Sequence, residues 1–167
     1  DTFQLNNGTL SGSVTGGGDS DNDTLIADDA VATSFVVTAD NAGTMTGLGG
    51  GFSEIENLTG GASADTFTFG AIGQITGNIA GGDGDDEFNL TDGLGVGGIL
   101  DGGIDGSDEL IGPDTGAAYN ITGPDAGTVT GVSGGFTDVE NLTGGTSADT
   151  FTFGAIGQIT GDIAGGD

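Results

Sequence analysis

The 167-residue sequence contains no lysine, arginine, histidine, cysteine or tryptophan. Without cysteine the chain cannot form a disulfide framework, so its stability must come from packing, backbone hydrogen bonds and bound ions. Nucleophilic catalysis needs a base such as histidine or lysine, and phosphate handling needs lysine or arginine. A pair of carboxylates could hydrolyse glycosides, but duplicated acidic turns would give several equivalent pairs and no single pocket. We therefore expect that the chain is not an enzyme.

The missing positive charge also limits the partners of the chain. Its 26 acidic residues give a formal net charge of −26, which excludes nucleic acid as a direct partner. The sequence has no apolar run long enough to cross a bilayer, so we expect no membrane insertion of this segment. It has no signal peptide either, and we interpret it as a segment of a longer repetitive protein whose secretion signal and anchor lie outside it.

The dominant positive feature is a tandem repeat in a chain with 39 glycines. Residues 52–83 recur at 136–167, a spacing of 84, with five substitutions that each preserve size or polarity closely. Repeats of this kind are typical of solenoids and arrays, whereas an enzyme builds one asymmetric pocket. We divide the chain into a first long repeat, 1–85, and a second, 86–167, which together form one continuous solenoid.

A shorter period, about a quarter of the long one, lies inside it. Asp-(Thr/Glu)-(Phe/Leu) recurs along the chain, and the predicted units begin at Asp1, Asp23, Thr44, Asp65, Asp86, Asp108, Thr128 and Asp149. Within a unit, residues 65–69 (Asp-Thr-Phe-Thr-Phe) alternate polar and apolar, which is typical of a strand with one buried face. Since no segment has helical spacing, we predict an all-β fold, a parallel β-solenoid (β-helix or β-roll) of about 21-residue coils with four coils per repeat.

This register makes a specific prediction for the core. Six phenylalanines should point into the solenoid and stack in ladders: Phe3, Phe67, Phe69, Phe88, Phe151 and Phe153. The composition alone leaves a disordered acidic linker open. The fixed register of phenylalanine, leucine and isoleucine argues against it, because a random coil does not need one.

The acidic turns are the candidate sites. Residues 81–89 (Gly-Gly-Asp-Gly-Asp-Asp-Glu-Phe-Asn) match the pattern G-G-x-G-x-D-x-U-x, in which U is a large apolar residue. This segment resembles the calcium-binding nonapeptide of the repeats-in-toxin (haemolysin-type) β-roll family. The resemblance implies that Asp83, Asp85 and Asp86 supply calcium ligands and that Phe88 lies in the core.

Stacking extends this prediction to neighbouring turns. A second acidic turn follows one coil later, and like charges about 4.8 Å apart repel by roughly 1 kcal/mol even in water. A hard divalent cation such as Ca²⁺ would neutralise them; the alternative is a solvated acidic edge that repels similar surfaces. The predicted metal ligands are Asp83, Asp85, Asp86, Asp101, Asp105 and Asp108, with a matching cluster at Asp19, Asp21 and Asp23.

These features favour a structural role. The stretch Glu-Asn-Leu-Thr-Gly-Gly-x-Ser-Ala-Asp-Thr-Phe also resembles those of large β-strand-repeat surface proteins, which implies a calcium-stabilised rod in an extracellular or cell-surface fibre or adhesin. The expected partners are copies of the chain itself, end to end or side by side, because uncapped β edges template addition. The alternative is a calcium-dependent ligand-, glycan- or ice-binding solenoid, which should carry its threonines on one uninterrupted face.

Overall fold

The computed structural model describes residues 1–18, 21–90 and 93–166, and in these ranges it contains only β-strands and no helix. No described segment could therefore cross a membrane as a long apolar helix. The expected all-β class is confirmed. The strands are β1 (Thr2–Gln4), β2 (Val14–Thr15), β3 (Thr24–Ile26), β4 (Ser34–Ala39), β5 (Ala42–Met45), β6 (Phe52–Ser53), β7 (Asn57–Thr59), β8 (Thr66–Phe69), β9 (Gln74–Ile75), β10 (Ile79–Asp83), β11 (Glu87–Asn89), β12 (Gly95–Val96), β13 (Leu100–Asp105), β14 (Glu109–Ile111), β15 (Ala118–Gly123), β16 (Ala126–Val129), β17 (Val132–Thr137), β18 (Asn141–Thr143), β19 (Thr150–Phe153) and β20 (Ile163–Ala164).

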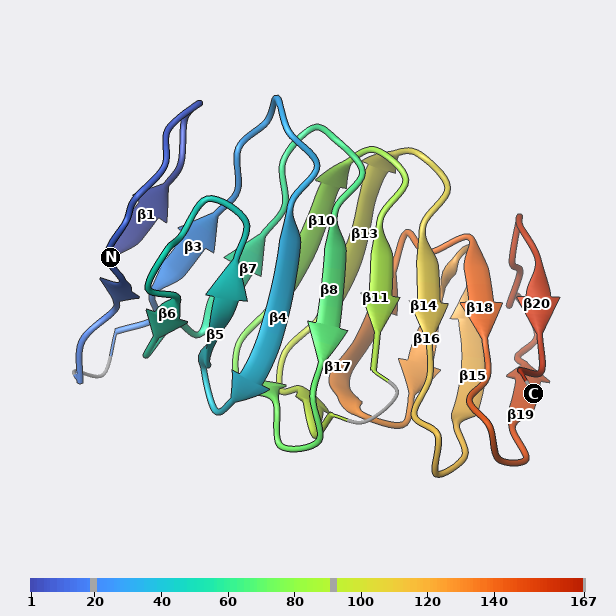
Figure 1. The fold of residues 1–167 in the computed structure, drawn as a ribbon. Coiled ribbons are helices and arrows are strands. Elements are labelled where there is room, and N and C mark those ends of the chain that lie inside the picture. Colours follow the sequence, from blue (N-terminus) through green and yellow to red (C-terminus); the bar gives the residue numbers. More distant parts are fainter. Residues whose placement is uncertain (19–20, 91–92, 167) are drawn as a thin grey trace.

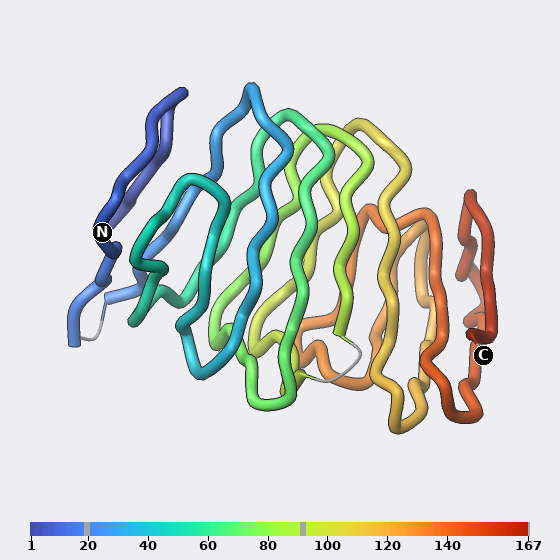
Figure 2. Tube along the Cα trace, viewed as in Figure 1, coloured from blue at the N-terminus to red at the C-terminus, as the bar shows by residue number. Residues whose placement is uncertain are grey.

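The strands form two sheets that lie face to face along an elongated molecule (Figure 1). Sheet 1 runs in the order β1-β3-β7-β10-β13-β17-β16-β15-β19, with β9 and β12 attached off this path. Sheet 2 runs in the order β2-β6-β5-β4-β8-β11-β14-β18-β20. The chain passes back and forth between the sheets as it advances, so the two termini lie at opposite ends of the molecule (Figure 2).

In the middle of the molecule, successive strands of each sheet are parallel and are separated in sequence by one short period. In sheet 1, Leu58 lies opposite Ile79, which lies opposite Leu100. In sheet 2, Phe67 lies opposite Phe88, which lies opposite Leu110. One circuit of the chain, with one strand in each sheet, therefore takes one short period here, as the sequence predicts.

Two segments depart from the predicted parallel arrangement. Strands β4, β5 and β6 form an antiparallel meander in sheet 2, and β15, β16 and β17 form another in sheet 1. The prediction that Thr44 and Thr128 each begin a parallel coil is therefore wrong, since both lie in the central antiparallel strand of a meander. The cause is a two-residue turn before each of these strands, whose second residue has a positive φ of 50° at Asn41 and 46° at Asp125. Asparagine and aspartate tolerate this conformation and favour tight reversals.

Matching strands of the two long repeats lie in opposite sheets. Strand β8 lies in sheet 2, whereas β19, which has the same Thr-Phe-Thr-Phe sequence, lies in sheet 1. Their pairing is nevertheless the same, because Phe35 lies opposite Phe67 in β4–β8 and Tyr119 lies opposite Phe151 in β15–β19. The local structure repeats, but the second copy faces the other way.

The core is a single apolar layer between the sheets, built from the inward-facing residue of each alternating pair. The rings of Phe35, Phe67 and Phe88 stack with centroid distances of 4.8 and 5.1 Å. Burial of Phe67, Phe69 and Phe88 confirms the predicted register in the middle of the molecule. Phe3 and Phe151 are only partly buried, and Phe153 is 51 % exposed, because these rings lie in the outermost circuits of the stack.

Candidate functional site

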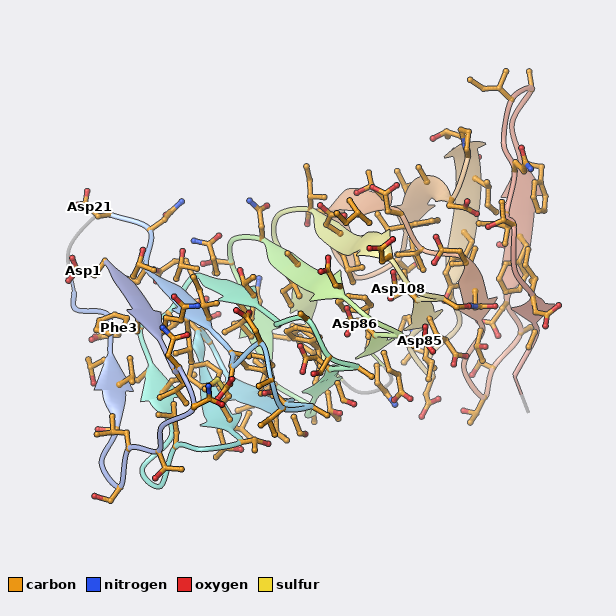
Figure 3. The ribbon with its side chains drawn as sticks, turned by 90° about the horizontal axis from the view of Figure 1, so that it is seen from above. Asp1, Phe3, Asp21, Asp85, Asp86 and Asp108 are labelled. Atoms are coloured by element: carbon orange, nitrogen blue, oxygen red, sulfur yellow. The ribbon has the colours of Figure 1, made fainter. Side chains whose placement is uncertain are left out.

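The predicted acidic site is divided between buried and exposed side chains. Asp23, Asp86 and Asp108 are each 2 % exposed. Asp101 is half-buried in β13, while Asp21, Asp83, Asp85 and Asp105 are exposed. Asp19 lies outside the residues that the structure describes. Figure 3 shows Asp85, Asp86 and Asp108 together near the middle of the molecule, well away from Asp21 at the N-terminal end.

The two acidic turns of the middle region lie next to each other, as predicted. Asp83 is the strand partner of Asp105, and the Gly84 amide donates a hydrogen bond to the Asp105 carbonyl at 3.0 Å. The Asp85 carboxylate accepts a hydrogen bond from the Ser107 amide at 2.9 Å. The neighbouring turns are therefore held together by main-chain donors.

Three buried carboxylates and one partly buried carboxylate form a continuous row, which we call the carboxylate ladder and define as Asp65, Asp86, Asp108 and Glu140. Each accepts a hydrogen bond from the backbone amide of the preceding circuit. Asp65 accepts from Thr33 at 2.6 Å, Asp86 from Asp65 at 2.7 Å, Asp108 from Asp86 at 2.8 Å and Glu140 from Asp108 at 2.8 Å. These amides lie just before a strand, where no ladder partner is available, so the carboxylates satisfy otherwise orphaned donors.

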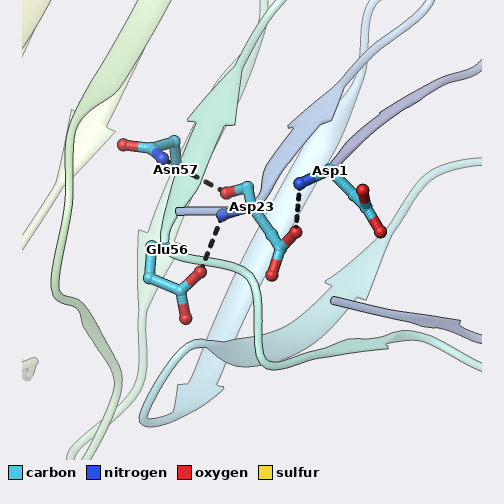
Figure 4. Close-up of polar contacts among 4 residues, drawn as sticks. All are labelled: Asp1, Asp23, Glu56 and Asn57. Carbon is cyan, nitrogen blue, oxygen red and sulfur yellow. Dashed lines mark hydrogen bonds and ion pairs between the residues drawn. The ribbon is translucent and has the colours of Figure 1, made fainter. Parts of the chain in front are cut away.

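The same arrangement recurs at the N-terminal end of sheet 1 (Figure 4). The Asp1 nitrogen donates to the Asp23 carboxylate at 2.5 Å, and the Asp23 amide donates to the Glu56 carboxylate at 2.9 Å. The Asn57 side chain completes the group by donating to the Asp23 carbonyl at 3.2 Å. Asp23 is therefore a structural counterpart of Asp86 and Asp108.

The first glycine of three Gly-Gly pairs, at Gly60, Gly81 and Gly102, makes room for a ladder carboxylate. A Cβ atom on Gly60 would lie 2.5 Å from Asp65 Oδ2, and one on Gly102 would lie 2.6 Å from Asp108 Oδ2. Both separations are too short for real contacts, so a side chain here would expel the carboxylate. The sequence pattern of Gly-Gly with a following aspartate is predicted to form a metal-binding turn. Where the aspartate is buried, the packing of its carboxylate against the first glycine explains the same pattern.

Burial changes the protonation of the ladder. It raises the pKa of Asp86 to about 7, opposed by the hydrogen bond from the Asp65 amide and reinforced by the negative charge of Asp108 and Asp65. Burial likewise raises the pKa of Asp108 to about 6, and it raises the pKa of Asp65. Because desolvation penalises the charged form, part of the ladder is protonated near neutral pH. The folded chain therefore carries less negative charge than its formal −26.

The structure does not gather the predicted metal ligands into one site. Within the described ranges, no three acidic side chains form a group that could hold a metal ion. Asp23, Asp86 and Asp108 use one carboxylate oxygen each for a main-chain nitrogen. The other oxygens of Asp23 and Asp86 are buried and have no hydrogen-bond partner among the described residues. Calcium binding stays a prediction. Its main candidate ligands are the exposed side chains of Asp83, Asp85 and Asp105.

Known proteins give no independent assignment. No family model, curated protein or solved structure matches this chain. The resemblance to toxin repeats and to surface-repeat proteins therefore remains a prediction from the residues that carry it.

Two ladder residues, Asp65 and Glu140, are not among the predicted site residues. The sequence carries a signal for Asp65, because an aspartate opens nearly every short unit. The prediction assigns chemistry only to aspartates in acid-rich turns, whereas the shared position before a strand is the informative property. For Glu140 the sequence offers a weaker signal, since its matching residue, Glu56, also precedes an Asn-Leu-Thr strand.

Proposed function

We propose that the chain is a β-solenoid segment whose function is mechanical, giving length and stiffness to an extracellular or cell-surface fibre or adhesin. The observation that carries the proposal is the repeated strand register. Phe35 pairs with Phe67, and Tyr119 pairs with Phe151 at the matching positions of the next long repeat. A repeat that reproduces its own register can be added many times without a new fold, because each unit contacts only its neighbours.

The distribution of polar groups also supports a rod rather than a catalyst. The most deeply buried carboxylates accept backbone hydrogen bonds along the stack. They therefore act as connections between circuits, and each adds a charge-assisted hydrogen bond where strand pairing has not yet begun. The outer faces carry the remaining acids, which keep neighbouring rods apart through like-charge repulsion.

The alternative of a ligand- or ice-binding face has less support. Thr66 lies opposite Glu87, which lies opposite Glu109, so acidic residues interrupt the threonine row within two circuits. The predicted threonines at 44 and 128 lie in antiparallel strands. A flat, uninterrupted threonine face is therefore not available on these strands.

The rod proposal is tested by covalent tandem chains that contain one, two and three copies of the 167-residue sequence. Each sheet path holds nine strands, and at about 4.8 Å per strand each copy should add about 43 Å. Negative-stain imaging and small-angle scattering should show particles that lengthen by this step at constant width. A compact particle whose longest dimension does not increase with copy number would contradict the proposal.

A further inference from the structure

The C-terminal end of the stack exposes apolar side chains whose sequence equivalents are buried. Phe153 is 51 % exposed and Ile163 is 38 % exposed, whereas the matching Phe69 and Ile79 are 1 % and 0 % exposed. Residues 65–83 and 149–167 differ in sequence only at Asn78, which is Asp162 in the second repeat. The difference in exposure therefore comes from the strands that cover these side chains in the first repeat and not in the second.

Within the chain, the start of the second repeat covers this surface. Strand β11 pairs with β8, β12 with β9 and β13 with β10, all in parallel. These pairs place Phe88 opposite Phe67, Val96 opposite Ile75 and Leu100 opposite Ile79. The junction between the two repeats is therefore apolar and paired in both sheets.

At the N-terminal end of the molecule, the strands pair with their neighbours in the same register as the second-repeat strands that cover the internal junction. Phe3 pairs with Leu25 as Phe88 pairs with Leu110. In the same way, the partner of Leu10 is Leu48 and the partner of Val96 is Val132. Three strand registers agree in total, since Val14–Phe52 also matches Leu100–Phe136.

The N-terminal end also has space for an incoming partner. An apolar cavity of about 180 Å³ opens there, lined by Phe3, Gln4, Leu5, Leu10, Val14 and Leu25. Leu10 is 41 % exposed, while its counterpart Val96 is 2 % exposed. Both ends of the molecule thus leave apolar surface uncovered that the internal junction covers.

We propose that a second copy of the chain docks its N-terminal end on this C-terminal end, in the register of the internal junction. Phe151 would then lie opposite Phe3, Ile159 opposite Leu10 and Ile163 opposite Val14. This inference deepens the proposed rod function and rests on it.

The geometry allows both sheets to continue across the contact. Strands β19 and β1 both belong to sheet 1, and β20 and β2 both belong to sheet 2. Because two repeats restore the original facing, the second copy needs no half-turn about the long axis. These four strands contain no charged residue, and the nearest acids, Asp1, Asp149 and Asp162, directly precede β1, β19 and β20. A head-to-tail contact of this kind does not close and produces an open filament with an axial repeat of about 43 Å.

The test uses the 167-residue chain and three variants, at about 0.5 M NaCl to screen the net charge. Phe153→Asp places a charge in the contact on the C-terminal side, and Phe3→Asp does so on the N-terminal side. Thr152→Asp is the matched control, because it adds the same charge to the same strand on the exposed outer face. Sedimentation and negative-stain imaging measure association, and circular dichroism checks that each variant retains its β-sheet.

The unmodified chain and Thr152→Asp should form filaments with an axial repeat of about 43 Å, while Phe153→Asp and Phe3→Asp should associate at least about 30-fold more weakly. An equimolar mixture of the two blocked variants should form a dimer and nothing longer. The intact C-terminal end of Phe3→Asp meets the intact N-terminal end of Phe153→Asp, and the remaining ends are blocked.

Three results would overturn the inference: a monomeric unmodified chain with β-sheet dichroism, equal association of Phe153→Asp and Thr152→Asp, or a mixture that stays monomeric. The first of these leaves the rod function intact, because covalent tandem copies can still lengthen. Loss of β-sheet dichroism in the unmodified chain would instead contradict the rod function itself.

Discussion

At the scale of single residues, the spacing of parallel strands arranges the aromatic core. Strands in a sheet lie about 4.8 Å apart, and the rings of Phe35, Phe67 and Phe88 stack at 4.8 and 5.1 Å with interplanar angles of 4° and 10°. Identical side chains at paired positions therefore stack because their backbones do. Each such pair adds stabilisation beyond its buried area, about 0.5–1.5 kcal/mol.

Phe67→Ala is expected to lower the free energy of unfolding by about 3–5 kcal/mol, because it leaves a cavity and removes two ring contacts. Equilibrium urea unfolding measures the change. Phe153→Ala is the matched control, since its ring is already 51 % exposed and it should lose about 1 kcal/mol or less. Equal losses in the two variants would mean that the first ring is not in the core.

The carboxylate ladder predicts an unusual pH dependence. The pKa values of Asp86 and Asp108 rise from 3.8 to about 7 and about 6 in the folded state. The folded chain then binds more protons than the unfolded chain between these values and 3.8, so its stability falls as pH rises. We expect the free energy of unfolding to decrease from about pH 4 to about pH 7.5 and then to level off.

Asp86→Asn should reduce this slope while keeping an oxygen for the Asp65 amide. Urea unfolding at several pH values, at constant ionic strength, measures the effect. Asp29→Asn is the control, because it removes an exposed acid that does not contribute to the raised pKa of Asp86 or Asp108. An unchanged slope in Asp86→Asn would show that the buried carboxyl does not titrate in this range.

At the scale of elements, two antiparallel meanders interrupt the parallel stack. Each depends on a tight turn whose second residue, Asn41 or Asp125, has positive φ. The Asn41 carboxamide oxygen also accepts a hydrogen bond from the Thr76 amide at 2.9 Å. Asp125 accepts the equivalent bond from the Thr160 amide at 2.7 Å. The turn residue thus sets the reversal and ties it to the neighbouring circuit.

Asn41→Ala should destabilise the fold by about 2 kcal/mol, because alanine pays backbone strain at positive φ and loses the side-chain hydrogen bonds. Asn41→Gly loses the same bonds without the strain, so thermal or urea unfolding should place it about 1 kcal/mol above the alanine variant. Asn41→Asp should be well tolerated, as the second repeat carries aspartate there. A glycine variant no more stable than the alanine variant would show that positive φ is not required.

At the scale of the whole molecule, the repeat reverses its facing at every copy. Between the meanders the chain crosses through β7, β8, β10, β11, β13 and β14, alternating between sheets. Each meander lies in one sheet, and from the start of one meander to the start of the next the chain passes through the two sheets alternately an odd number of times. The next meander therefore lies in the opposite sheet.

Charge is also a property of the whole molecule, because 26 acids have no basic side chain to balance them.

Calcium is therefore expected to stabilise the folded chain. A ligand that binds only the folded form adds about 2.7 kcal/mol per site at about 100 times its dissociation constant. The measurement is the melting temperature by β-sheet circular dichroism during titration with a calcium chelator at fixed ionic strength. A double variant, Asp83→Asn with Asp105→Asn, should remove the effect, because these exposed acids are strand partners. If neither the spectrum nor the melting temperature moves, the acids form only a solvated edge.

The sequence by itself determined the all-β class, the position of the inner face and the stacking of the two middle acidic turns. These properties depend on local alternation and on a repeat spacing that can be counted. Phe67, Phe69 and Phe88 are buried where the alternation predicts them, because successive side chains of a strand point to opposite faces whatever the strand pairs with.

Only the tertiary structure decided which strands pair, and in which direction. The segments at Thr44 and Thr128 have strand-like alternation in either direction, and the turns before them made them antiparallel. The change of sheet between repeats depends on the number of crossings, which no short segment encodes. The role of Asp86 was likewise decided by its surroundings, since the same Gly-Gly-x-Gly-x-Asp pattern suits a metal or a backbone amide. Burial between stacked circuits placed that carboxylate against the Asp65 amide, because an orphaned main-chain donor in the interior must be satisfied.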